Sequence, residues 1–222
     1  MPNYRYCDIS LGSNIALPEL PLSVDNRPEV SFRCLHASSL IPDSPAWIDR
    51  HSLSDIDSFL VIEKQESAYL LRHFDLADFI INGQGTEIEC RMQKALPEET
   101  IRHLLLDQVL PRLLSHQGRL MVHASAVLTS KGIIAFLGDT GWGKSTLAAS
   151  LVQPGVSLMT DDCLSITEIE GTLFGIPAYT GLRLLPDSLG RLYPDSPEVM
   201  DFAHYSEEEA SICCECEIRS RR

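Results

Sequence analysis

The sequence predicts an α/β protein in two parts, a small strand-rich N-terminal module over residues 1–115 and a mixed α/β domain over residues 116–222. Three observations lead to this prediction. Short apolar runs separated by turn residues fill much of the first part, and a helical pattern closes it. A glycine-rich segment then lies between a buried-strand pattern and a helical one. Strands and helices do not alternate regularly afterwards, so the second sheet is expected to be mixed rather than doubly wound.

The N-terminal module contains four strand-like runs before the helix. The third run ends in Asn82-Gly83, a strong turn signal, and the fourth alternates polar and apolar residues as a half-buried strand does. Together they predict a small antiparallel meander, whereas the proline- and serine-rich stretch from Pro18 to Pro45 gives only weak predictions. The four runs are Ser58–Lys64, Ala68–His73, Ala77–Ile81 and Thr86–Met92.

The helix that closes the module is expected to begin at Pro97. Proline is favoured in a first helical turn, and the acidic Glu98 and Glu99 suit the positive end of the helix dipole. Apolar residues then recur at helical spacing from Ile101. Pro111 is expected to kink the helix or end it early, because proline removes a backbone hydrogen bond. The boundary between the two parts is expected near residue 115.

The second part begins with two apolar runs joined by a turn, which predict paired strands. A short helix follows the glycine-rich segment, and a further strand runs directly into Thr160-Asp161-Asp162. Two more runs flank Glu170-Gly171 as a predicted hairpin. The expected elements are strands at Leu120–Leu128, Ile133–Leu137, Val156–Met159, Leu164–Ile169 and Thr172–Ile176, and a helix at Ser145–Val152.

Composition narrows the classes of function. The 222 residues carry a formal net charge of −13, which argues against a nucleic-acid ligand and against an anionic membrane surface. We expect a cytoplasmic protein, because the sequence has neither a secretory signal pattern nor a long apolar run. The seven cysteines are then expected to be reduced thiols. The cluster of Cys213, Cys214 and Cys216 lacks the second ligand pair that a zinc site needs.

The glycine-rich segment fits the pattern G-x-x-x-x-G-K-[ST] at every fixed position. Glycines let the backbone wrap around phosphate, and the following helix presents its free N–H groups and dipole to the anion. Lys144 is expected to reach the β- and γ-phosphates, and Ser145 to ligate Mg²⁺. The expected nucleotide-binding residues are Gly138, Asp139, Thr140, Gly141, Trp142, Gly143, Lys144, Ser145 and Thr146.

An acid pair, Asp161-Asp162, follows the next strand. Strand ends gather near the phosphates in folds of this kind, so two adjacent acids there can divide the work. One would bind the metal, and the other would accept a proton from an attacking hydroxyl. His123, on the strand before the loop strand, would lie near the same site if those two strands pair. A histidine on such a strand is otherwise most often a core residue.

The run MVHASAVLTSKGIIAFLGDTGWGKSTLAASL followed by LMTDD resembles the catalytic domain of the HPr kinase/phosphorylase family. The shared features are His123, the loop Gly138–Ser145 and the pair Asp161-Asp162, in that order and at short spacing. The segment Pro177–Leu184 is similar to shorter relatives found with modified peptides such as lasso peptides, and the N-terminal module is loosely similar to theirs.

This resemblance implies a P-loop kinase domain that uses ATP and Mg²⁺ to phosphorylate a serine of a small protein or peptide precursor. By that analogy Asp161, Asp162, His123 and Lys144 are catalytic, one aspartate being the base that His123 assists. The metal ligands are expected to be Ser145 and the other aspartate, for which we favour Asp162. Homo-oligomerisation is left open, because the classical members assemble into hexamers.

The chain departs from the family after Tyr193, where it ends in about thirty residues without a clear periodic pattern, EEEASICCECEIRSRR being the last of them. We expect this end to be truncated. The alternative function is therefore a nucleotide-binding, catalytically incomplete module that associates with a partner. A GTPase or motor-type ATPase is disfavoured, because no guanine-specificity motif follows the loop.

Overall fold

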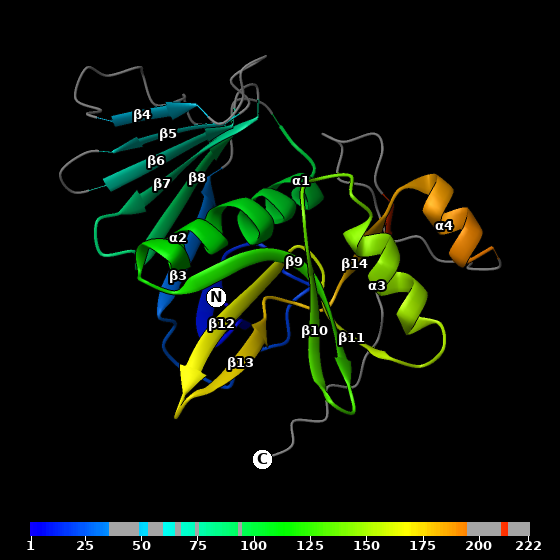
Figure 1. The fold of residues 1–222 in the computed structure, drawn as a ribbon. Coiled ribbons are helices and arrows are strands. Elements are labelled where there is room, and N and C mark those ends of the chain that lie inside the picture. Colours follow the sequence, from blue (N-terminus) through cyan, green and yellow to red (C-terminus); the bar gives the residue numbers. More distant parts are fainter. Residues whose placement is uncertain are drawn as a thin grey trace. The chain divides into compact units, whose positions relative to one another are not determined.

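The computed structural model describes residues 1–35, 49–52, 60–64, 68–73, 76–92, 95–194 and 210–212 (Figure 1). The chain divides into two compact units, Met1–Leu113 and Leu114–Arg222. Both are built on β-sheet, one mixed and one antiparallel, with few helices, so the α/β class expected from the sequence is confirmed. The boundary was predicted near residue 115, and the two units divide between Leu113 and Leu114.

The first unit contains an eight-stranded sheet in the order β1-β2-β3-β8-β7-β6-β5-β4. β2 pairs with β3, and β3 with β8, in parallel, while the other neighbours are antiparallel. The strands are β1 Asn3–Tyr6, β2 Ile9–Ser13, β3 Val30–Leu35, β4 Asp49–Ser52, β5 Leu60–Lys64, β6 Ala68–His73, β7 Ala77–Asn82 and β8 Glu87–Met92.

The predicted meander corresponds to β5–β8, whose consecutive strands pair antiparallel. The meander prediction is therefore confirmed for these strands. The sheet as a whole is mixed, because β3 lies between β2 and β8 and pairs with both in parallel. The β3–β8 pairing joins residues 56 apart in sequence, such as Ser31 and Glu87, for which a local pattern carries no signal. β1 and β2 were likewise not predicted. Ser58 and Phe59, the start of the first predicted run, lie outside the described residues.

The helical segment that follows is continuous through Pro111. It comprises α1 Glu98–His103, a π-helical stretch Leu104–Val109, and α2 Leu110–His116. Of the two expected effects of Pro111, a kink or an early end of the helix, the early end is wrong, because α2 continues to His116. Proline cannot donate to the carbonyl four residues back and its ring crowds that carbonyl. The wider π turn directly before Pro111 is an adjustment that lets the helix continue.

The second unit is organised around β9, a ten-residue strand at Leu120–Thr129. Its first half pairs with β12, and its second half lies between β10 and β11. β13 completes the sheet beside β12, and all these pairings are antiparallel. The elements are β10 Gly132–Leu137, α3 Lys144–Val152, β11 Ser157–Thr160, β12 Cys163–Ile169, β13 Thr172–Pro177, β14 Leu182–Leu184, α4 Pro186–Leu192 and β15 Ala210–Ile212, which pairs with β14.

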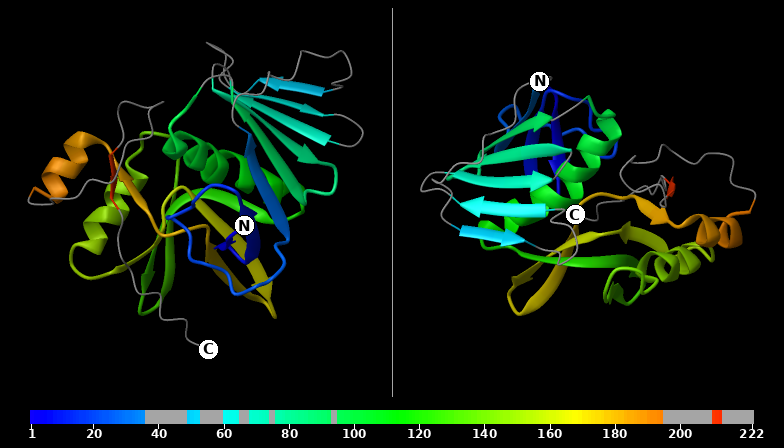
Figure 2. Two further views of the ribbon diagram at one scale, coloured as in Figure 1. Left: turned by 180° about the vertical axis from the view of Figure 1, so that it is seen from behind. Right: turned by 90° about the horizontal axis from the view of Figure 1, so that it is seen from above.

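These elements confirm several predictions for this half of the chain. β9 and β10 pair as a hairpin, but the expectation that Ile133–Leu137 is a buried strand is wrong, because Ile134 and Leu137 are 44% and 65% exposed. β12 and β13 form another hairpin, in which Ile169 pairs with Thr172. Glu170 and Gly171 between them both have positive φ, 51° and 78°, as a type I′ turn requires. Figure 2 shows α3, β14 and α4 of this unit from two further sides.

A small apolar core fixes α3 against the sheet and β14. Its members are fully or almost fully buried, and their contacts determine where the N-terminus of α3 lies relative to the ends of β11 and β14. The core residues are Val127, Ala148, Ala149, Leu158, Leu182 and Leu184.

The cysteines of this chain lie partly within and partly outside the described residues. The described cysteines Cys7, Cys34, Cys90 and Cys163 are not joined in disulfides, which agrees with the expected reduced thiols. Cys213, Cys214, Cys216 and most of the C-terminal tail lie outside the described part. In the portion of the chain that the structure describes, no helix combines the length and apolar character needed to cross a membrane.

Candidate functional site

The glycine-rich loop connects the end of β10 to the start of α3, as the sequence predicts. Gly138, Gly141 and Gly143 have φ values of 156°, 83° and 81°. Conformations of this kind are costly for residues with a Cβ, so the pattern of glycines is explained by the path of the backbone. A Cβ built at Gly141 or Gly143 would meet no described atom within 4 Å, which leaves open space beside the loop.

Lys144 folds back over this loop. Its Nζ donates to the carbonyl oxygens of Gly138, at 2.9 Å, and Asp139, at 3.1 Å. An ammonium group presents three donors and a compact positive charge. The charge is therefore held at the mouth of the loop, where it can attract a negatively charged group.

The N-terminus of α3 adds to the attraction for an anion. Gly143 is the N-cap residue, and no side chain of the described residues caps the first turn. The first N–H groups of a helix have no acceptor within the helix, and they lie at the positive end of its dipole. The loop and the helix together form the arrangement that binds phosphate in many proteins.

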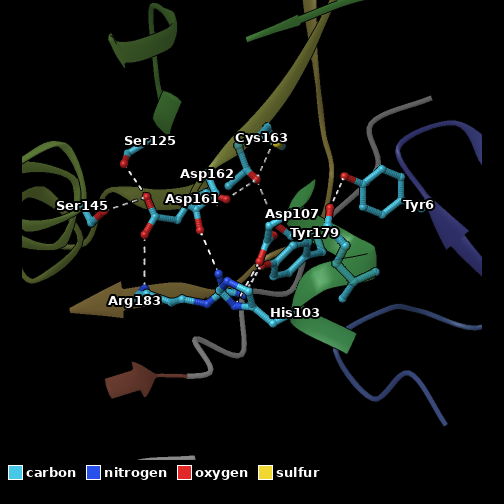
Figure 3. A network of polar contacts seen from close by, with 12 residues as sticks. Tyr6, His103, Asp107, Ser125, Ser145, Asp161, Asp162, Cys163, Tyr179 and Arg183 are labelled. Carbon is cyan, nitrogen blue, oxygen red and sulfur yellow. Dashed lines mark hydrogen bonds and ion pairs between the residues drawn. The ribbon is translucent and has the colours of Figure 1, made fainter. Parts of the chain in front are cut away.

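Asp161 accepts hydrogen bonds from three different elements next to the loop (Figure 3). It lies directly after β11 and is 2% exposed. Its Oδ1 accepts hydrogen bonds from the hydroxyls of Ser125 and Ser145, the latter at 3.0 Å, and its Oδ2 accepts from the amide of Arg183 at 3.1 Å. The carboxylate thus joins β9, α3 and β14 at one point.

The environment raises the pKa of Asp161 to about 6. Burial is the main cause, since it penalises the charged form, and the neighbouring negative charge of Asp162 adds to it. The hydrogen bonds from Ser125, Arg183 and Ser145 act in the opposite direction. A buried carboxylate with such a shift is a group that a bound cation would stabilise.

Asp162 faces a different environment. It has a φ of 72°, and its backbone carbonyl accepts from the amide of Ala124 at 3.1 Å. Its carboxylate is paired with Arg183, whose Nη1 lies 3.1 Å from Oδ2, and a quarter of the Asp162 side chain is exposed. Arg183 in turn donates through Nη2 to the Tyr179 hydroxyl at 2.7 Å. Asp162 is therefore both anchored and open to solvent.

The structure pairs Ser145 with Asp161, whereas the sequence analysis favoured Asp162 beside Ser145. The reason is local. The left-handed backbone at Asp162 turns the chain between β11 and β12, so the two side chains diverge. The Asp161 side chain is directed to the start of α3, and that of Asp162 to β14.

His123 lies on β9 in register with Cys163, the residue that follows Asp162. Its backbone neighbour Ala124 is bonded to Asp162, so the histidine lies close to the acid pair along the strand. Its side chain is exposed, and among the described residues the imidazole has no hydrogen-bond or ion-pair partner. Side chains two apart on a strand share a face, so His123 and Ser125 project to the same side of β9.

The other predicted loop residues have varied surroundings. Asp139 and Thr140 are exposed. Trp142 is 75% exposed, and its ring packs over Gly138, where an added Cβ would come within 3.2 Å of it. The Thr146 hydroxyl shares a hydrogen bond with Ser188 of α4 at 3.0 Å, so this side chain holds α3 to α4.

Three residues of the site were not predicted from the sequence as site residues: Ser125, Tyr179 and Arg183. Ser125 could have been suggested by its position two residues after His123, on the same strand face. Arg183 stands between two leucines in a short strand, a pattern that equally describes a surface strand. Tyr179 carries no local signal, because its hydroxyl meets Arg183 through the fold of the intervening turn.

The oxygen-rich surroundings of Ser145 and Asp161 suit a hard divalent cation such as Mg²⁺. Mg²⁺ in phosphate-transfer sites is held by one or two protein oxygens, with phosphate and water completing the shell. One hydroxyl and one carboxylate in contact at 3.0 Å meet that requirement. The described residues contain no cluster of three or more His, Cys, Asp or Glu side chains that could hold a metal by themselves.

Comparisons of this chain with protein-family models, with curated proteins and with solved structures found no match. The chemistry of the site is therefore inferred from the residues of this chain.

Proposed function

We propose that this protein is an ATP-dependent serine kinase with a P-loop kinase domain similar to that of HPr kinase. The observation that carries the proposal is the contact between Ser145 at the start of α3 and Asp161 at the end of β11, with Asp162 turned to a separate, partly exposed position. Phosphoryl transfer needs groups that hold the metal and a separate group that acts as the base. Here Ser145 and Asp161 form the first set, and Asp162 is the second.

The loop supplies the triphosphate site. Backbone N–H groups from Gly141 to Ser145 surround the phosphates, and Lys144 exchanges its two loop carbonyls for phosphate oxygens. Ser145 and Asp161 would hold Mg²⁺, which would supply positive charge to offset the charge of the nucleotide phosphates. The raised pKa of Asp161 supports this role, because a cation beside a buried carboxylate favours its ionised form.

Asp162 is the proposed general base. The acceptor serine Oγ forms a bond to the γ-phosphorus while the bond from that phosphorus to the β,γ-bridging oxygen breaks, and ADP leaves with the electron pair. The serine proton passes to the Asp162 carboxylate and then to solvent. Partial exposure of Asp162 supports this assignment, because an acceptor must reach it from outside. His123, which is exposed and in register with Cys163 beside the acid pair, assists the base.

The acceptor is a serine of a small protein or of a peptide precursor. The absence of disulfides among the described cysteines fits a cytoplasmic protein. Neither a nucleic acid nor a membrane is required as a partner.

The test is transfer of radiolabel from γ-labelled ATP to a degenerate peptide library, each peptide with one central serine, and to a phosphocarrier protein. Serine-to-alanine peptides provide the blank. Asp162→Asn should reduce transfer by on the order of 100-fold or more while leaving Mg²⁺·ATP affinity nearly unchanged, because a base acts in the transition state. Asp187→Asn, an exposed carboxylate on α4, is the matched control and should behave as wild type. Transfer by Asp162→Asn at the wild-type rate would refute the assignment of the base.

A further inference from the structure

Arg183 contacts both aspartates of the acid pair. Its backbone amide donates to Asp161 Oδ2 at 3.1 Å, and its guanidinium Nη1 lies 3.1 Å from Asp162 Oδ2. We infer that Arg183 is a positioning residue for phosphoryl transfer, which fixes the direction of the Asp162 carboxylate relative to the bound phosphates. This inference rests on the proposed kinase function.

The fold fixes the direction of the arginine itself. Arg183 is the middle residue of β14, and its neighbours Leu182 and Leu184 are 0% and 1% exposed in the core under α3. Successive side chains on a strand point to opposite faces, so burial of both leucines directs Arg183 to the side of the acid pair. The Tyr179 hydroxyl accepts from Nη2 at 2.7 Å and orients the guanidinium plane.

The charges around the acid pair explain why the contact between Arg183 and Asp162 matters for catalysis. Two consecutive carboxylates repel one another, and the charge of Asp162 contributes to the raised pKa of Asp161. A guanidinium keeps its positive charge at any physiological pH, and its planar fork restricts how a carboxylate meets it. Arg183 therefore offsets the repulsion and orients the carboxylate from one side, which leaves the side toward solvent for the acceptor.

The expected effect is a loss of turnover with little loss of nucleotide affinity. Arg183→Gln should lower kcat for the serine-peptide library by on the order of 10- to 100-fold, because misplacement of a reacting group by about 1 Å has effects of this size. The Kd for Mg²⁺·ATP, measured by calorimetry, should change by less than about threefold. Arg183→Lys, which keeps the charge but not the fork, should recover part of the lost kcat.

Two further variants separate positioning from general damage. Tyr179→Phe removes one hydroxyl that orients the guanidinium and should give a smaller decrease in kcat than Arg183→Gln. Arg191→Gln, at an exposed arginine of α4, is the matched control and should equal wild type. Thermal melting of each variant establishes that it is folded before kcat is compared.

A readout without catalysis distinguishes this inference from the proposed function. In crystal structures of the wild type and of Arg183→Gln, the Asp162 carboxylate should keep its direction toward Arg183 in the wild type and turn away from residue 183 in the variant, because the guanidinium contact at 3.1 Å is lost. If the wild type phosphorylates no serine while the Asp162 carboxylate turns as expected, the kinase proposal fails and the positioning role stands. If Arg183→Gln matches wild type in both kcat and the direction of the Asp162 carboxylate, the inference is overturned.

Discussion

Asp161 and Asp162 are consecutive in the chain, yet their carboxylates have different surroundings. Asp161 is buried among hydroxyls and an amide, whereas Asp162 is partly exposed and ion-paired. The sequence predicts that the two acids divide metal binding and proton transfer, and it favours Asp162 as the metal ligand, whereas the structure places Asp161 beside Ser145. That assignment depends on the backbone turn at Asp162, which no pattern of residue types encodes.

Lys144 provides the residue-scale prediction for nucleotide binding. Lys144→Ala removes a charge-assisted contact to phosphate worth about 1.5–3 kcal/mol, so the affinity for Mg²⁺·ATP should fall by on the order of 10- to 100-fold. Calorimetric titration of the variant checks this. Lys131→Ala, in the exposed β9–β10 turn, keeps the same change in net charge and should bind as wild type. Equal affinity of the two variants would show that the loop is not the site.

At the scale of elements, the loop between β10 and α3 was predictable because its glycines, lysine and serine are defined by local geometry. The same holds for the β12–β13 hairpin, whose Glu170-Gly171 turn adopts the backbone that its sequence favours. Contacts between distant segments were not predictable. β3 pairs directly with β8, although β4–β7 separate the two strands in sequence. Arg183, on β14, contacts Asp162, which follows β11. Such contacts arise from packing, on which local sequence patterns carry little information.

Substitution of Gly143 can distinguish the effect of backbone strain on stability from the effect of the loop's shape on nucleotide binding. Gly143 and Gly118 have similar positive φ values, 81° and 86°, and neither would bring an added Cβ within 4 Å of a described atom. Alanine at either position should cost about 1–2 kcal/mol of unfolding free energy through backbone strain. Only Gly143→Ala should weaken Mg²⁺·ATP binding, because its methyl group occupies the space that phosphate needs.

Chemical denaturation and calorimetry on both variants test this prediction. Gly118 lies in the turn between α2 and β9, away from the loop along the chain, and so serves as the matched control. A loss of affinity of the same size in both variants would mean that strain, and not the shape of the loop, determines binding.

At the scale of the whole molecule, the two units contain buried groups that respond to pH in opposite directions. In the first unit, burial, with the positive charges of Arg112 and His103, lowers the pKa of His73 from 6.5 to about 3. In the second unit, the pKa of Asp161 is raised from 3.8 to about 6. The unfolded chain therefore binds a proton at His73 below pH 6.5 that the folded unit does not bind. The folded second unit holds a proton at Asp161 that the unfolded chain loses above pH 3.8.

Acidification from about pH 6 to about pH 4.5 should consequently destabilise the first unit through His73 and stabilise the second through Asp161. Each contribution is on the order of 1–2 kcal/mol over that interval. Hydrogen exchange measured by mass spectrometry, corrected for the intrinsic effect of pH, resolves the units. His73→Gln should reduce the pH response of residues 1–113, and Asp161→Asn that of residues 114–194. A response that is unchanged by either substitution would contradict the assignment of these groups.

The most direct test of the proposed site is a calorimetric titration of the full chain with ATP, in the presence and absence of Mg²⁺. The contact of Ser145 with Asp161 beside an open phosphate loop predicts binding that Mg²⁺ strengthens, and Asp161→Asn should lose most of that strengthening. A folded sample that binds no ATP, or binds it equally well with and without Mg²⁺, would contradict the proposed site.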